Sequence, residues 1–175
     1  EKNTIKVDIY QGIPKSDKME LIIQKSIELG ANSIIPVSMK RCVVKIEPKD
    51  ETKKIIRWQK IAESAAKQSG RNSIPEIKKI TTIQDITQII NKYDIVLVAY
   101  ENEKQNTIKN ELSKLKNKQQ LKIAVIIGPE GGIEENEVKS LNKSGAKIIT
   151  LGNRILRTET VALNILSIIM YELEM

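Results

Sequence analysis

The sequence predicts an α/β fold with a mainly parallel sheet and helices on both of its faces. Short apolar runs alternate with longer amphipathic segments along the chain, which is typical of βαβ units. The runs at 94–100 and 123–127 are apolar at nearly every position, as strands of a buried parallel sheet are. The run at 123–127 and a shorter one at 148–151 each stop at a glycine. We expect one domain over residues 1–175, because that length is ordinary for a single hydrophobic core.

The first half of the chain is expected to contain two strands and two helices. Alternating apolar positions from Ile5 to Ile9 indicate a strand, whereas the apolar spacing after Asp17 indicates a helix. Asp17 and Glu20 have the spacing of a capping box, and Gly30 is suited to end that helix. The expected bounds are strand 4–10, helix 17–29, strand 33–37, a basic loop or hairpin over 38–50, and helix 51–69. The inner face of the second helix is expected to be Ile55, Ile61, Ala62 and Ala65.

The second half continues the alternation and ends in a strongly apolar helix. The expected elements are a strand from residue 75, a helix near 83–91, strands over 94–100, 123–127 and 148–151, a solvated helix near 114–118, and a helix over 159–173. Apolar side chains cover most of the circumference of this last helix, so it must be buried on nearly all sides. Its own core or a second subunit can provide that burial, and we favour a second subunit because the helix is terminal in a small domain.

The net charge of +7 is concentrated in the first half of the sequence. Residues 1–80 hold 17 lysines and arginines against 10 acidic residues, whereas residues 81–175 hold 12 of each. A basic surface in the first half would attract a polyanion such as RNA. The same lysines are also compatible with solvated helix faces, and segment 38–50 is as compatible with an inert loop as with an RNA contact. The only tryptophan is Trp58 and phenylalanine is absent, which disfavours a base-stacking platform.

Other residue counts exclude several classes of function. The chain has no histidine, so we expect no metal site of the zinc type and no Ser-His or Cys-His catalysis. The single cysteine, Cys42, excludes an internal disulfide. The sequence contains no run of 18 apolar residues and no basic-then-apolar N-terminal signal. We therefore expect a cytoplasmic location and no membrane partner.

The segment 123–163 holds the most informative motifs. Its first apolar run ends in Gly-Pro-Glu-Gly-Gly at 128–132, and its second is followed by Gly152 and a turn over 153–160. These loops follow strands or precede a helix, where open α/β sheets bind ligands. A tight turn needs glycine with or without a ligand, so the first motif alone leaves both explanations open. Neither a G-x-x-x-x-G-K-[ST] loop nor a Rossmann G-x-G-x-x-G is present, which argues against a nucleotide triphosphatase or an NAD enzyme.

Two motifs in this segment, GPEGGIEENEV and LGNRILRTETVAL, resemble the paired signature of the RsmE family, the 16S rRNA (uracil-N3)-methyltransferases of the SPOUT class. Upstream, PKSDKMELIIQKSIELGANSIIPV and RWQKIAESAAKQSGRNSIPEI resemble the same family in the same order. The resemblance implies a C-terminal trefoil knot, S-adenosylmethionine (SAM) bound in the knot loops, and a homodimer through the knot and the last helix. It also implies 16S rRNA in the 30S subunit as the partner. The SAM-binding residues that it implies are Gly128, Glu130, Gly131, Gly132, Leu151, Gly152, Ile155, Leu156, Arg157, Thr158, Thr160 and Ala162.

The reaction implied by this resemblance needs a base or a cationic clamp, because uracil N3 carries a proton at neutral pH. We predict that Arg157 and Arg71 position the uracil or stabilise its anion, and that Glu130 is the leading candidate for the base. Further carboxylates and arginines that the chain offers for these roles are Glu101, Glu159 and Arg154. The alternative for Glu130 and Glu159 is a role as helix caps or ion-pair partners, and the alternative for Arg71 is a cation at the end of a helix.

Two rival functions are compatible with the sequence. One is a non-catalytic RNA-binding or ribosome-associated module whose glycine loops are structural, and SAM titration would identify it. The other is a SPOUT enzyme that methylates a tRNA ribose, which only the RNA product would distinguish. In the family, a small N-terminal β-barrel that resembles RNA-binding PUA modules precedes the first strand. We expect that barrel to be absent here and rRNA methylation by residues 1–175 to be weak.

Overall fold

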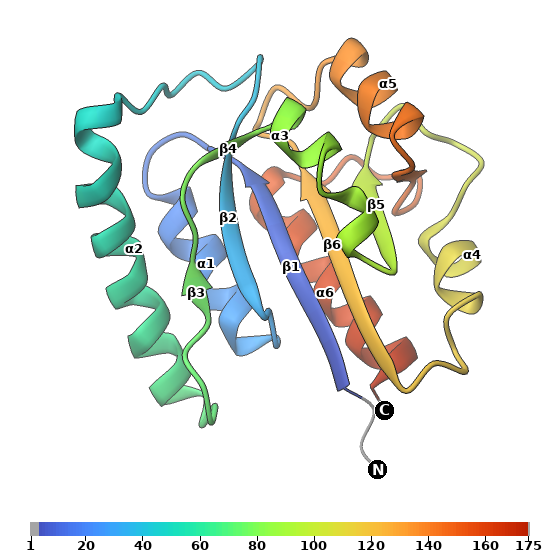
Figure 1. The fold of residues 1–175 in the computed structure, drawn as a ribbon, viewed down its shortest axis with the longest axis horizontal. Coiled ribbons are helices and arrows are strands. Elements are labelled where there is room, and N and C mark those ends of the chain that lie inside the picture. Colours follow the sequence, from blue (N-terminus) through green and yellow to red (C-terminus); the bar gives the residue numbers. More distant parts are fainter. Residues whose placement is uncertain (1–3, 175) are drawn as a thin grey trace.

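The fold is a seven-stranded parallel sheet flanked by helices (Figure 1). The computed structural model describes residues 4–174. The strands are β1 (Thr4–Gly12), β2 (Ser33–Ser38), β3 (Glu76–Ile77), β4 (Thr81–Thr82), β5 (Ile95–Ala99), β6 (Gln120–Ile127) and β7 (Lys147–Ile149). Their order is β3-β2-β1-β6-β5-β7, and β4 also pairs with β2. Every pairing between the described strands is parallel, so their carboxyl ends lie along one edge of the sheet.

Helices cover both faces of this sheet, as predicted. They are α1 (Lys18–Glu28), α2 (Pro48–Gln68), α3 (Ile83–Thr87), α4 (Ile108–Ser113), α5 (Glu135–Lys143) and α6 (Thr158–Leu173), with a 3-10 turn, η1 (Ile90–Lys92). One core, which includes Ile9 and Ile123, is covered by α1, α2, α4 and α6. The other core, which includes Tyr10 and Ile126, is covered by α3 and α5. Neighbouring residues of a strand point to opposite faces, which is why β1 and β6 contribute to both cores.

Most of the predicted elements are confirmed. The five longest predicted strands correspond to β1, β2, β5, β6 and β7, and the predicted helices at both ends of the chain correspond to α1, α2 and α6. Gly30 ends α1 as expected, with a φ of 100° that favours glycine. On α2, Ala62 and Ala65 are buried as predicted, Ile55 and Ile61 are half-buried, and Trp58 adds a large buried side chain.

The helix expected near 114–118 lies earlier in the chain, as α4. The side chain of Thr107 caps α4 by accepting a hydrogen bond from the Asn110 N–H at 3.1 Å. Leu112 and Leu115 are buried, so the apolar residues rather than the lysines decide where the chain packs. The lysine-rich segment is the turn that leads into β6.

The capping box predicted at Asp17 is also wrong. Asp17 makes no side-chain capping hydrogen bond, and Glu20 instead pairs with Arg57 of α2. A capping box is present on α5, where Glu134 and Glu137 satisfy each other's backbone N–H groups.

A buried polar cluster lies on the face of β1 that α3 covers. The Asp8 carboxylate, 1% exposed, accepts hydrogen bonds from Asn32 Nδ2 and Ser33 Oγ at 2.7 Å and from the Tyr93 hydroxyl at 2.8 Å. The Tyr93 hydroxyl is also 2.8 Å from the Tyr10 hydroxyl. Burial raises the pKa of Tyr10, and burial together with these hydrogen bonds raises the pKa of Tyr93.

The last helix, α6, is buried along one stripe that includes Ala162, Ile165 and Ile169. Its flanks are partly buried, and Tyr171 is 68% exposed. The second subunit that we expect against this helix therefore stays a prediction. Within residues 4–174, no helix combines the length and apolar character needed to cross a bilayer.

Candidate functional site

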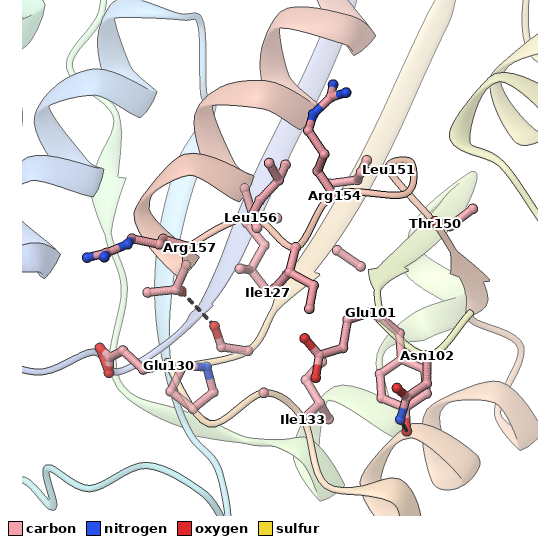
Figure 2. Close-up of a pocket in the computed structure, with 18 of the residues that line it drawn as sticks. Glu101, Asn102, Ile127, Glu130, Ile133, Thr150, Leu151, Arg154, Leu156 and Arg157 are labelled. Carbon is pink, nitrogen blue, oxygen red and sulfur yellow. Dashed lines mark hydrogen bonds between the residues drawn. The ribbon is translucent and has the colours of Figure 1, made fainter. Parts of the chain in front are cut away.

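A pocket of about 400 Å³ lies at the carboxyl edge of the sheet, among the loops that follow β5, β6 and β7. Parallel strands bring these three loops together although they are distant in sequence. Apolar side chains form part of its wall: Ile127, Ile133, Leu151 and Leu156 (Figure 2). The size and the mixture of apolar wall and polar groups suit a small-molecule ligand.

Two glycines shape the pocket in different ways. A Cβ atom at Gly128 would lie 2.9 Å from the carbonyl carbon of Gly132 and from the backbone nitrogen of Ile133, so only glycine fits there. At Gly152 a Cβ atom would meet no atom within 4 Å, but the φ of 124° is one that other residues rarely adopt. Gly128 thus lets its loop fold back on itself, and Gly152 leaves open space beside the pocket.

A hydrogen-bonded relay ties the first residue of α6 to two strand ends. Gln11 Nε2 donates to Thr158 Oγ1 at 2.8 Å and to the Gly12 carbonyl at 3.0 Å. The Thr158 hydroxyl in turn donates to the Gly128 carbonyl at 2.7 Å, the dashed line in Figure 2. Gln11 is fully buried and Thr158 is 6% exposed. The relay therefore fixes the start of α6 against the loop that follows β6.

Charged side chains surround the opening of the pocket. Glu130 accepts a hydrogen bond from the Lys15 backbone N–H at 2.8 Å, which holds the carboxylate without neutralising it. In Figure 2, Glu130 and Arg157 lie on one side of the pocket, and Glu101 lies on the other side. Glu159 Oε2 lies 3.8 Å from Lys18 Nζ and makes no hydrogen bond within the described residues. Arg41 and Arg154 also line the pocket, which therefore offers carboxylates, three guanidinium groups and lysine ammonium groups around a partly apolar space.

The family model for the RNA methyltransferase domain matches residues 1–170. The chain is 41% identical to the ribosomal RNA small subunit methyltransferase E of Bacillus subtilis over 173 residues, which covers 98% of the chain and 68% of that relative. The chain belongs to this RsmE family. The enzyme of the same name from Mesomycoplasma hyopneumoniae is 36% identical over 162 residues. That match covers 93% of this chain and 68% of the relative.

Structural comparison agrees with this membership. The crystal structure of a ribosomal RNA small subunit methyltransferase E from Neisseria gonorrhoeae, bound to S-adenosyl methionine, is similar with a TM-score of 0.86 at 30% identity. The match covers 99% of this chain and 68% of that one. The chain thus spans about two thirds of the length of these RsmE relatives. The resemblance to the RsmE family that the sequence motifs indicated is confirmed.

Most of the predicted SAM-binding residues line the pocket: Gly128, Glu130, Gly132, Leu151, Gly152, Ile155, Leu156, Arg157 and Thr158. Three others lie outside its lining. The Gly131 carbonyl accepts a hydrogen bond from Arg41 Nη1 at 3.1 Å, Thr160 is exposed on α6, and Ala162 is buried against the core. Thr160 lies on the side of α6 turned away from the lining residues, whereas Ala162 lies on the same side as Thr158 but one turn further into the helix, where it packs in the core.

The structure does not bring Arg71 to the pocket. Its Nη1 donates to the carbonyls of Ile27 at 3.1 Å and Ala31 at 2.6 Å, where α1 ends and the chain enters β2. This is the amino edge of the sheet, opposite the pocket. Desolvation lowers the pKa of Arg71. Within this chain the Arg71 guanidinium therefore binds carbonyl groups at the end of a helix. The sequence had left that role open, but the helix is α1 and not α2, which directly precedes Arg71.

Several lining residues escaped the sequence analysis. Arg41 and Lys18 reach the pocket from the first half of the chain, and the loop after β5 contributes Tyr100, Glu101 and Asn102. Only Glu101 was named among the candidates. The end of the strand at 94–100 was a usable signal, because every parallel strand delivers its next loop to the same edge.

Proposed function

We propose that the chain is a SAM-dependent methyltransferase that modifies N3 of a uridine in 16S rRNA of the small ribosomal subunit. The pocket formed by the loops after β5, β6 and β7 carries this proposal. Its support is the membership of the RsmE family and the likeness to a relative whose crystal structure contains SAM. The base and the atom that are modified come from the family resemblance.

The residues present fit SAM as the bound group. Ile127, Ile133 and Leu156 offer an apolar wall for a purine, and the open space beside Gly152 leaves room that a side chain would fill. The carboxylate of Glu101 adds negative charge that suits a cationic ligand. SAM, when bound, supplies a methyl group carried on a positively charged sulfur.

The chain's own residues have three tasks in this reaction: to orient the uracil, to accept its N3 proton and to stabilise the anion. We propose Glu130 as the base, because its carboxylate lines the pocket and is held by a backbone N–H rather than by a cation. Arg157, on the same side of the pocket, is proposed to stabilise the uracil anion (Figure 2). Arg71 has no place in this proposal, because its guanidinium is engaged at the opposite edge of the sheet.

Mass spectrometry of the RNA product tests the reaction. The chain is incubated with SAM and with 30S subunits that lack the modification, and the digested 16S rRNA is compared with a reaction without SAM. We expect one SAM-dependent methyl group on a uracil base. A methyl group on a ribose would support the rival ribose methyltransferase, and no SAM binding in calorimetry would support the non-catalytic module.

We further propose that residues 1–175 form the methyltransferase domain, that residues 150–173 complete a trefoil knot, and that the domain acts as a cytoplasmic homodimer through α6. Exposed apolar side chains on the neighbouring helices α1 and α6, Leu21 at 44% and Tyr171 at 68%, support the dimer. Sedimentation at micromolar concentration should give one species of twice the monomer mass, and Tyr171→Glu should shift it towards monomer. A monomer in the unaltered chain would contradict the dimer.

A further inference from the structure

A second hollow, of about 480 Å³, lies beside the pocket between α5 and the loop that follows β5. We call it the α5 groove. Tyr100 and Asn102 line both the α5 groove and the pocket, so the two spaces are adjacent. Val138 and Ile148 give the groove an apolar floor. A strand lying in the groove would therefore pass beside the pocket.

Lysines dominate the walls of the α5 groove. Lys139 and Lys143 are four residues apart, so they lie on the same side of α5, and Lys147 begins β7 beside them. The ammonium group of Lys139 is 3.3 Å from the Glu135 carboxylate in an exposed pair, which contributes little. Lys143 and Lys147 take part in no ion pair within residues 4–174.

The one carboxylate in the groove is already engaged by its own loop. Glu103 Oε1 accepts the backbone N–H groups of Gln105 at 2.9 Å and of Asn106 at 3.0 Å. The described lining of the groove thus holds three lysines and one carboxylate, and Glu135 outside the lining pairs with one of these lysines. The groove has a net positive charge although residues 81–175 carry no net charge as a whole.

We propose that the α5 groove binds the phosphates of a single strand of the substrate RNA and leads the target base to the pocket. This inference rests on the proposed function. Lysines along a groove attract phosphates without regard to sequence, and an aromatic ring at the end of such a groove offers a base a surface for stacking. Tyr100 has that position, and its hydroxyl accepts a hydrogen bond from Asn102 Nδ2 at 3.2 Å.

The basic surface predicted in residues 1–80 provides a matched comparison. Lys53, Lys54 and Lys60 are exposed on α2, which covers the other face of the sheet from α5. They carry the same charge as the three groove lysines, and none of them lines the pocket or the α5 groove. If net charge alone attracted RNA, removing either set of lysines would have the same effect.

The test compares two triple variants of the full chain, Lys139→Gln/Lys143→Gln/Lys147→Gln and Lys53→Gln/Lys54→Gln/Lys60→Gln. Fluorescence anisotropy measures binding to a labelled single-stranded RNA of mixed sequence between 50 and 200 mM salt. The salt slope of the groove variant should fall by about 2, because each lost contact to a single strand removes about 0.7. Between 50 and 200 mM salt, the RNA affinity of the unaltered chain falls by some factor. For the groove variant that factor should be roughly 20 times smaller. The α2 variant should keep the slope.

Calorimetry with SAM and sedimentation of each variant accompany the test. Unchanged SAM affinity with a lowered slope supports the groove. Equal slopes for the two variants, no RNA binding by the unaltered chain at 50 mM salt, tighter binding of poly-glutamate than of RNA, or a changed oligomeric state in the groove variant would each overturn it. Failure of the proposed function is a separate result, because the unaltered chain would then either not bind SAM or place the methyl group on a ribose.

Discussion

Replacing Thr158 by valine isolates the relay between Gln11, Thr158 and Gly128. Valine keeps the shape of the threonine side chain and nearly the same helix propensity, so the main change is the loss of the hydroxyl group. That hydroxyl accepts from Gln11 Nε2 at 2.8 Å and donates to the Gly128 carbonyl at 2.7 Å. The substitution therefore removes two hydrogen bonds at a position that is 6% exposed.

The expected loss of stability follows from those two bonds. A hydrogen bond contributes about 1 kcal/mol net, and a buried polar group left without a partner costs about 1–3 kcal/mol. Gln11 Nε2 keeps its bond to the Gly12 carbonyl, and Gly128 is only half-buried, so neither group bears the full cost. We expect Thr158→Val to lower the free energy of unfolding by about 2–3 kcal/mol.

Urea denaturation measures this change, and the chain supplies its own controls. Thr160→Val changes the same atoms on an exposed position of α6 and should stay within about 0.5 kcal/mol of the unaltered chain. Thr158→Ser keeps the hydroxyl and should lose less than Thr158→Val. If Thr158→Val is no more destabilising than Thr160→Val, the relay does not hold α6 to the loop and the reasoning fails.

Three further predictions concern the ligand, the chemistry and the alkaline limit. Gly152→Val should weaken SAM binding measured by calorimetry. The control is Gly70→Val, because Gly70 also has a positive φ and open surroundings but lies outside the pocket, and this variant should keep its SAM affinity. Equal affinities of the two variants would remove Gly152 from the site. Arg157→Ala should lower the rate of methyl transfer by about 100-fold or more with a smaller change in SAM affinity, and equal losses would make it a cofactor-binding residue. The raised pKa values of Tyr10 and Tyr93 mean that the unfolded chain loses protons first above about pH 10. Stability should therefore be intact below that pH and fall above it, and replacing both tyrosines by phenylalanine should flatten this fall in urea titrations.

The strands and the main helices could be predicted because their signals are local. The apolar runs that became β5 and β6 are buried on both faces, and such strands are apolar at successive positions whatever surrounds them. Predictions based on polar residues were less successful. The polar segment Lys114–Lys118 was expected to form a solvated helix. The helix α4 lies before it instead, because the buried Leu112 and Leu115 determine how this part of the chain packs.

The sequence by itself determined the fold class, the family and the two glycine-rich loops of the pocket, because these depend on residues that are close together in the chain. Only the tertiary structure decided which distant side chains join them. Gln11 reaches Thr158 across 147 positions, a contact that no local pattern encodes. Arg71 looked equally suited to a cleft and to a helix end, and the packing of α2 against α1 placed it at the end of α1. Parallel pairing assembles one edge of the sheet from segments far apart in sequence, so the composition of that edge depends on the order of the strands rather than on any single motif.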